Sequence, residues 1–71
     1  MNTINPEKLY HSKWTAVRPR NKEKHFLVTA LERDAEETVV AVVLEAVYTR
    51  RETTLPWQTL KDDDTWRMGW R

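Results

Sequence analysis

The residues with the clearest chemical potential in this sequence are four tryptophans and a run of basic side chains. An indole fills a core or, where it is exposed, stacks on a base or on a partner's side chain. Basic residues alternate with other types between positions 18 and 24, so several can point the same way and neutralise phosphates. The candidate binding residues are Lys13, Arg18, Arg20, Lys22, Lys24, Arg50, Arg51, Trp57, Trp66 and Trp70.

Side chains suited to catalysis are few. His11 and His25 are the only histidines, there is no cysteine, and nothing near either histidine completes a nucleophile and base pair. Asp62, Asp63 and Asp64 carry oxygens that a hard divalent cation prefers, but from a helix start they do not converge on one point. They are more typical of a helix N-terminus, where carboxylates meet unpaired N–H groups. We therefore expect a protein that is not an enzyme and needs no metal or cofactor.

Length and composition indicate a single small domain. The chain has 71 residues, one glycine and no internal repeat, and we expect a loose arm over residues 1–11 followed by one domain over residues 12–71. No apolar run is long enough to cross a membrane, and the first residues lack the apolar core of a signal peptide. Charge is segregated: residues 1–25 carry +4, residues 26–49 carry −4 and residues 50–71 carry +1. We expect a cytoplasmic protein.

Alternating apolar residues predict strands in the first half of the chain. Trp14 and Ala16 share one face of the first strand, and Pro19 ends it because proline lacks the N–H that a strand ladder needs. We expect Trp14, and Trp57 after Pro56, to be core residues. Phe26 and Val28 share one face of the second strand. The expected segments are an arm or one helical turn over residues 1–11, a strand at 12–17, a basic loop at 18–24, a strand at 25–32 and a charged turn at 33–37.

Residues 38–49 carry two competing periodicities. Their valines match a helical stripe, but five valines in nine residues favour a strand because β-branched side chains lose rotamer freedom in a helix. An unbroken apolar face at period two, from Val40 to Tyr48, also fits a strand. We predict a strand here, with a helix as the alternative.

The last third of the chain predicts a fourth strand and two helical segments. A turn of two arginines leads into a strand that ends at Leu55, and residues 56–60 indicate one tight helical turn. The three aspartates then begin a short C-terminal helix that stacks Trp66 and Trp70 at i and i+4. We expect both to keep an exposed edge, because such a helix buries only one face. The predicted fold is mainly β: a small four-stranded antiparallel meander, as an SH3-like barrel or an open sheet, with a short C-terminal helix.

Five groups of residues hold aromatic side chains in a fixed order: Ser12–Val17, Lys22–Phe26, Leu44–Tyr48, Leu55–Trp57 with Leu60–Asp62, and Trp66 with Gly69–Trp70. Together they resemble a family of small tryptophan-rich bacterial proteins, a domain of unknown function. The resemblance covers residues 12–71. It implies a bacterial single-domain protein held together largely by its tryptophans, and it brings no catalytic or ligand-binding residue.

Two functions from different classes fit these residues. The first is a small module that binds RNA or single-stranded DNA, with phosphates on the basic loop and bases on exposed indoles. The second is a protein-interaction or adaptor module that uses an exposed tryptophan patch. A basic loop beside an aromatic-bearing strand favours nucleic acid, while a net charge of only +1 weighs against it. The sequence does not indicate an oligomeric state.

Overall fold

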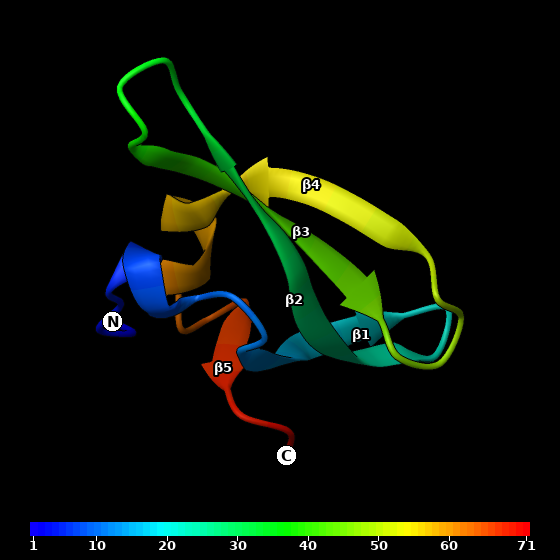
Figure 1. Cartoon of the computed structure of the whole chain (residues 1–71). Coiled ribbons are helices and arrows are strands. Elements are labelled where there is room, and N and C mark those ends of the chain that lie inside the picture. Colours follow the sequence, from blue (N-terminus) through cyan, green and yellow to red (C-terminus); the bar gives the residue numbers. More distant parts are fainter.

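The computed structural model describes all 71 residues, and its main feature is an open five-stranded antiparallel sheet (Figure 1). The elements are η1 Pro6–Lys8, β1 Lys13–Arg20, β2 Glu23–Arg33, β3 Val39–Ala46, β4 Glu52–Pro56, η2 Trp57–Lys61 and β5 Trp66–Met68. The strands β1 to β4 form a meander, and β5 returns to pair with β1, which gives the order β4-β3-β2-β1-β5. No helix is long and apolar enough to span a membrane.

The strand β3 resolves the ambiguous stretch in favour of the period-two pattern. Val42, Leu44 and Ala46 are completely buried, and the residues between them are only partly buried. A valine-rich segment of this kind packs well on a pleated sheet, where β-branched side chains lose little freedom. The predicted strand is therefore confirmed, and so is the helical turn after the fourth strand, which is η2.

The basic segment 18–24 is a tight hairpin, and its prediction as a loop was wrong. The strand β1 continues through Pro19 to Arg20, and Asn21 and Lys22 make the turn with φ angles of 54° and 63°. Both values are left-handed, as in the two-residue turns that match the twist of a hairpin. The strand continues through Pro19 because β5 pairs only with the first part of β1. Beyond that pairing β1 is an edge strand, where proline is tolerated.

The chain ends in a strand where the sequence predicts a helix. The aspartates at residues 62–64 form a turn in which the Asp62 carboxylate accepts hydrogen bonds from the backbone N–H two residues later and from the next threonine hydroxyl. Trp66 then enters β5 and points into the core, while Trp70 lies beyond the strand. Gly69 separates the two with a φ of 79°, which breaks any helical i, i+4 relation between them.

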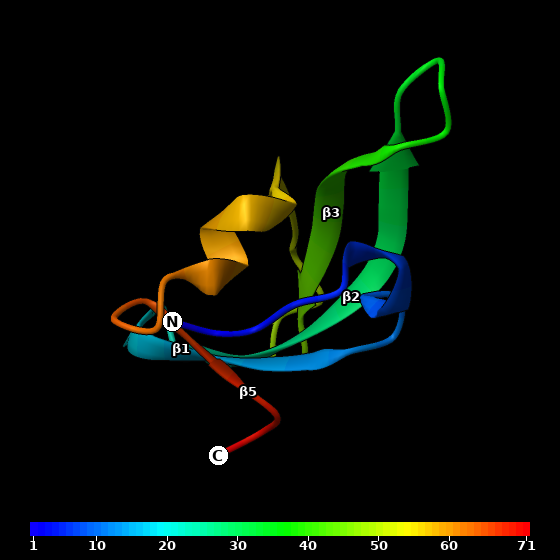
Figure 2. The ribbon, with the colours of Figure 1, turned by 90° about the vertical axis from the view of Figure 1, so that its left-hand side faces the viewer.

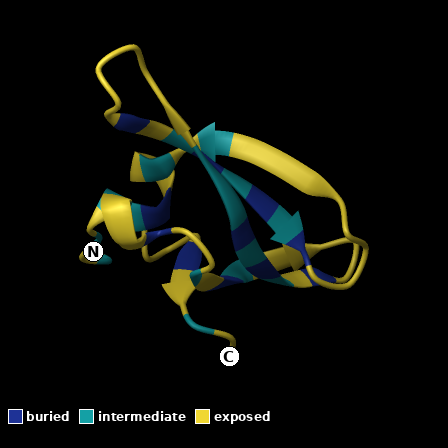
Figure 3. Ribbon diagram, viewed as in Figure 1, coloured by how far each residue is buried: buried dark blue, intermediate teal, exposed yellow.

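The core lies on the concave side of the sheet. In Figure 2 the sheet bends into a corner that holds η2, and Leu60 of η2 is completely buried there. Trp14 of β1 is 1% exposed, and its Nε1 donates a hydrogen bond to the Ser12 hydroxyl at 2.9 Å. Figure 3 shows buried residues at intervals along β2 and β3, while β4 and the hairpin turns are mostly exposed. The prediction of Trp14 as a core residue is confirmed.

The N-terminal segment, which contains η1, lies against this core. Leu9 is buried and Ile4 packs against the same cluster. The side-chain amide of Asn2 donates hydrogen bonds to the carbonyls of Leu60 and Trp66, at 2.8 and 2.9 Å. The first residues therefore tie η2 to β5. Of the two predictions for this segment, the single helical turn is the one that forms.

Candidate nucleic-acid interface

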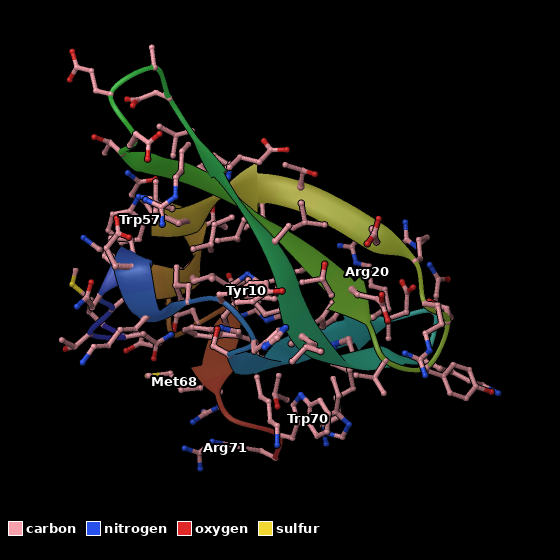
Figure 4. All side chains as sticks on the ribbon, in the orientation of Figure 1. Tyr10, Arg20, Trp57, Met68, Trp70 and Arg71 are labelled. Atoms are coloured by element: carbon pink, nitrogen blue, oxygen red, sulfur yellow. The ribbon has the colours of Figure 1, made fainter.

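The predicted basic residues lie on two opposite faces of the sheet. Between β1 and β2 the pairing register shifts, since Thr15 pairs with His25 but Arg20 pairs with Glu23. Arg20 lines a cavity on the core side, together with Arg18. Lys24 lines a shallow depression on the outer side. In Figure 4, Arg20 lies on the β3 side of β1, whereas Trp70 and Arg71 lie together on the other side.

The outer side carries a group of cations around one tryptophan, which we call the outer cationic face. It consists of Lys13, Lys24, Arg67, Arg71 and Trp70, contributed by β1, β2, β5 and the residues after β5. Trp70 is 44% exposed, more than any other tryptophan. The Lys13 Nζ lies 4.8 Å from the centroid of the Trp70 ring system. Arginine and lysine thus border a half-exposed aromatic surface.

Trp70 is held in place by hydrogen bonds to the strands beneath it. Its Nε1 donates to the carbonyl of Phe26 at 2.9 Å. On either side of it in sequence, the buried Thr15 hydroxyl donates to the Gly69 carbonyl at 2.7 Å and accepts from the Arg71 N–H at 2.9 Å. The indole is therefore ordered although nearly half of its surface is exposed.

The four cations of the outer cationic face have no acidic partner. The ion pairs of the protein join Arg33 to Glu7, Arg50 to Glu45, Arg51 to Glu23 and the N-terminal amine to Asp63. None of these pairs includes a residue of the outer cationic face. Arg67 is near enough to Asp63 to help lower the pKa of that carboxyl, so the charge available to an anionic partner comes mainly from Lys13, Lys24 and Arg71.

Glu23 neutralises one of the predicted binding residues, Arg51. Its side chain is 4% exposed and accepts hydrogen bonds from the Arg51 guanidinium and from the Thr49 hydroxyl. These hydrogen bonds, with that from Arg51 contributing most, lower the pKa of Glu23 to about 2. The contact fastens the β3–β4 turn to the β1–β2 hairpin, which Figure 1 shows side by side. A single acid within a basic segment is the sequence signal for such a pair.

The remaining predicted binding residues do not gather at one site. Lys22 is at the tip of the β1–β2 hairpin, and Arg50 is paired in the β3–β4 turn. Trp57 is half-buried in η2, where the Lys61 Nζ lies 4.9 Å from its ring centroid. Trp66 is 8% exposed, so the expectation that it keeps an exposed edge was wrong: β5 turns its side chain into the core.

Sequence reasoning missed Arg67 and Arg71. The predicted C-terminal helix was defined by its aspartates and by Trp66 and Trp70, and it singled out neither arginine. In β5 the residue after the buried Trp66 must point outward, because successive side chains on a strand alternate. Recognition of that strand would have placed Arg67 on the outer side.

Most side chains that suit acid–base or metal chemistry make other contacts. The His11 ring stacks on Tyr10 with centroids 3.8 Å apart, and His25 Nε2 lies 3.0 Å from a backbone carbonyl. The carboxylates of residues 62–64 lie within 4.8 Å of one another but are exposed. Asp62 binds its own turn and Asp63 pairs with the N-terminal amine, which lowers the pKa of Asp63.

A comparison with protein-family models identifies the family of the chain. The model of the family described as tryptophan-rich protein (DUF2389) matches residues 12–71. The chain belongs to this family. Comparisons with curated proteins and with solved structures gave no match. In this tryptophan-rich protein the four indoles differ in burial: Trp14 and Trp66 are core residues, Trp57 is half-buried, and Trp70 is exposed with Lys13 over its ring.

Proposed function

We propose that this tryptophan-rich protein is a non-enzymatic module that binds single-stranded nucleic acid through the outer cationic face. The observation that carries the proposal is an ordered, half-exposed indole with Lys13 over its ring, on the same side of the sheet as a depression lined by Lys24, Arg67 and Arg71. Cations neutralise the phosphates of a strand, and a base stacks on an aromatic surface with a gain of about 1–3 kcal/mol.

The order of Trp70 before binding supports this use. A side chain that is already held by hydrogen bonds loses little conformational freedom when a ligand covers it. The hydrogen bond from Trp70 Nε1 to the Phe26 carbonyl provides that order and leaves part of the ring exposed. The same bond consumes the only polar hydrogen of the indole, so the ring is available for stacking and not for base-specific hydrogen bonding.

The low net charge of the chain is compatible with the proposal because part of its acidic charge lies far from the outer cationic face, although Asp62–Asp64 directly precede β5. Glu32, Asp34, Glu36 and Glu37 lie at the β2–β3 turn, which Figure 1 shows at the opposite end of the molecule from the C-terminus. The field at the outer cationic face is therefore set by its own cations more than by the total of +1.

The fold adds a weaker, analogical support. The first four strands form a meander, and the fifth returns to pair with the first after a 3-10 turn. This is the connectivity of an SH3-like barrel, and we propose that the fold is of that kind. Small barrels commonly present one sheet face to oligonucleotides. Because a fold does not fix a function, the proposal rests on the outer cationic face and not on this connectivity.

The test is a titration of the protein with short oligo(dT), followed by tryptophan fluorescence at several salt concentrations. Four phosphate contacts predict that the logarithm of the binding constant falls by about 2.8 for each tenfold rise in salt, at about 0.7 per contact on a single strand. Lys24→Ala should reduce that slope by about 0.7. A flat salt profile would refute the proposal.

Lys61 offers a matched control for Lys13. Each lysine Nζ lies just under 5 Å from an indole centroid, but Lys61 lies over Trp57 and outside the outer cationic face. Lys13→Ala should weaken oligonucleotide binding and flatten its salt dependence, whereas Lys61→Ala should leave both unchanged. Equal effects of the two changes would show that binding does not use the outer cationic face.

A protein-interaction module is the second candidate. Val40, Val47 and Tyr48 are exposed apolar side chains of β3 and the turn that follows it, and exposed apolar surface is typical of protein contacts. This candidate does not need the cations of the outer cationic face. It predicts salt-insensitive binding of a protein partner that Tyr48→Ser weakens and Lys24→Ala does not.

A further inference from the structure

The two edge strands of the sheet, β5 and β4, differ in how their outward backbone groups are bonded. In the pairing of β5 with β1, the N–H and C=O groups of Trp66 and Met68 point away from β1. The Trp66 N–H donates to the Asp62 carbonyl at 2.9 Å, and the Trp66 carbonyl accepts from the Asn2 side chain at 2.9 Å. The Met68 carbonyl accepts from the Arg71 Nε at 3.1 Å. At this edge only the Met68 N–H has no hydrogen bond.

The edge of β4 has no bonds of this kind. Ala46 and Arg51 extend the β3–β4 ladder as a hydrogen-bonded pair, since the Ala46 N–H donates to the Arg51 carbonyl at 2.9 Å. Such pairs alternate with non-hydrogen-bonded ones along an antiparallel ladder, so Glu52 and Thr54 point their backbone groups away from β3. Both residues are exposed, and none of these outward groups makes a hydrogen bond within the chain. The strand β4 is therefore the open edge of the sheet.

We propose that β4 pairs with β4 of a second copy of the chain, in an antiparallel dimer whose two-fold axis passes beside Thr53. In this register Glu52 lies opposite Thr54 of the second copy, and the N–H of each residue donates to the carbonyl of the other. All the outward groups of both residues are then bonded. A two-fold axis beside Thr54 would instead place Glu52 opposite Pro56, which has no N–H to donate.

The side chains of β4 agree with this register. The Glu52 carboxylate makes no ion pair within the chain and lies opposite Glu45 on β3, a like-charge pair that is unfavourable. Glu45 already has a partner in Arg50 at 3.0 Å. In the dimer the Glu52 carboxylate lies beside the Thr54 hydroxyl of the second copy, which can donate to it. On the other face Thr53 meets Thr53 of the second copy, and threonine pairs across strands are favourable.

Closure of the sheet selects a second copy over an unrelated extended peptide. A peptide added to β4 presents a new unpaired edge of its own, to which a further strand could add. A second copy uses its own open edge in the contact, and the joint sheet then ends at β5 on both sides. Those ends are bonded within their own chains, so the assembly stops at two copies. The outer cationic face involves β1 and β5, so this proposal does not depend on nucleic-acid binding.

The first test is sedimentation velocity of the wild type over a range of concentrations. Two short strands bury less than the roughly 1,200 Å² of a stable interface, so we expect a weak dimer with a Kd on the order of 0.1 mM. A sedimentation coefficient that rises with concentration and levels off at the dimer supports the proposal. A protein that stays monomeric up to about 1 mM, or that forms larger assemblies, overturns it.

Thr54→Pro removes one outward N–H and no bond of the β3–β4 ladder, because the Thr54 N–H does not donate to β3. It should dimerise at least about tenfold more weakly, since each dimer loses two hydrogen bonds. Met68→Pro is the matched control: it removes the unbonded outward N–H of the opposite edge, and it should dimerise like the wild type. Melting transitions show that both variants are folded. Dimerisation of Thr54→Pro with wild-type affinity, or equal weakening by both changes, overturns the proposal.

Amide hydrogen exchange of the wild type, followed by NMR, tests the contact without a substitution. The N–H groups of Glu52 and Thr54 should exchange more slowly as the protein concentration rises through the Kd, because they become bonded in the dimer. The Met68 N–H serves as the internal control, and its exchange should not change. Exchange of Glu52 and Thr54 that is independent of concentration while a dimer forms would show that the copies meet at another surface, and the proposal would be wrong.

Discussion

Replacing Trp14 by alanine removes the largest of the fully buried side chains in the protein. Trp14 is 1% exposed and also donates the hydrogen bond to Ser12. A change from tryptophan to alanine in a core costs about 3–5 kcal/mol. At about 0.05–0.15 kcal/mol per residue, a chain of 71 residues has a free energy of unfolding of about 4–11 kcal/mol. Trp14→Ala is therefore expected to remove most of the stability.

The variant Trp70→Ala tests a surface tryptophan, and its stability is compared with that of Trp14→Ala. Trp70 is 44% exposed, so it buries about half as much apolar area as Trp14, and it also loses the hydrogen bond to the Phe26 carbonyl. With about 25 cal/mol for each Å² of buried apolar surface, the expected cost is about 2–3.5 kcal/mol. This variant should keep a cooperative fold while it loses the aromatic surface of the outer cationic face.

Urea denaturation followed by far-ultraviolet circular dichroism measures both variants against the wild type. Trp14→Ala should show a large fall in the transition midpoint or no folded baseline, and Trp70→Ala a moderate fall with an unchanged slope. If the two variants lose the same stability, or if Trp14→Ala unfolds within about 1 kcal/mol of the wild type, the assignment of Trp14 as the main core residue is refuted.

Three further expectations follow from contacts described above. Trp14→Phe removes a bonded indole N–H and Trp66→Phe an unbonded one, so Trp14→Phe should be the more destabilising by about 1 kcal/mol or more in thermal unfolding; equal losses would contradict this. The pKa of Glu23 is near 2 in the folded protein, below its ordinary 4.5, so Glu23 contributes stability above pH 4.5 that is lost as the pH falls toward 2. Glu23→Gln should therefore flatten an acid-unfolding curve, and a curve as steep as that of the wild type would refute the assignment. Lys22→Gly relieves a left-handed φ of 63° and should raise the free energy of unfolding by up to about 1 kcal/mol, so a lower melting temperature would count against this account of the turn.

The sequence predicts the strands whose burial is one-sided and regular. In β3 the valines and Leu44 alternate with less buried residues, so period two and β-branching both indicate a strand. The 3-10 turn of η2 begins directly after Pro56, the last residue of β4, close to where the sequence predicts it. Trp14 is assigned correctly as a core residue for the same reason, since it lies within an alternating segment.

The errors arise where pairing with a distant strand overrides local pattern. Trp66 and Trp70 have helical spacing, but residues 66–68 pair with the free edge of β1 and form a strand. Gly69, with its positive φ, would interrupt a helix but lies just beyond the end of this strand. The division of the basic residues between two faces depends on the register shift between β1 and β2. A register shift of this kind leaves no periodic pattern in the sequence. The sequence therefore predicted only some of the residues of the outer cationic face.

The pairing of β5 with β1 also governs how the protein can fold. Trp14 pairs with Met68 and Asn2 bonds to the Trp66 carbonyl, so segments from the two ends of the chain must meet before the sheet is complete. Only the hairpin pairings of β1 to β4 are local along the sequence. Proteins dominated by non-local pairing fold in milliseconds to seconds and not in microseconds. Stopped-flow refolding should therefore resolve the main phase, with the β2–β3 hairpin forming ahead of the β1–β5 edge.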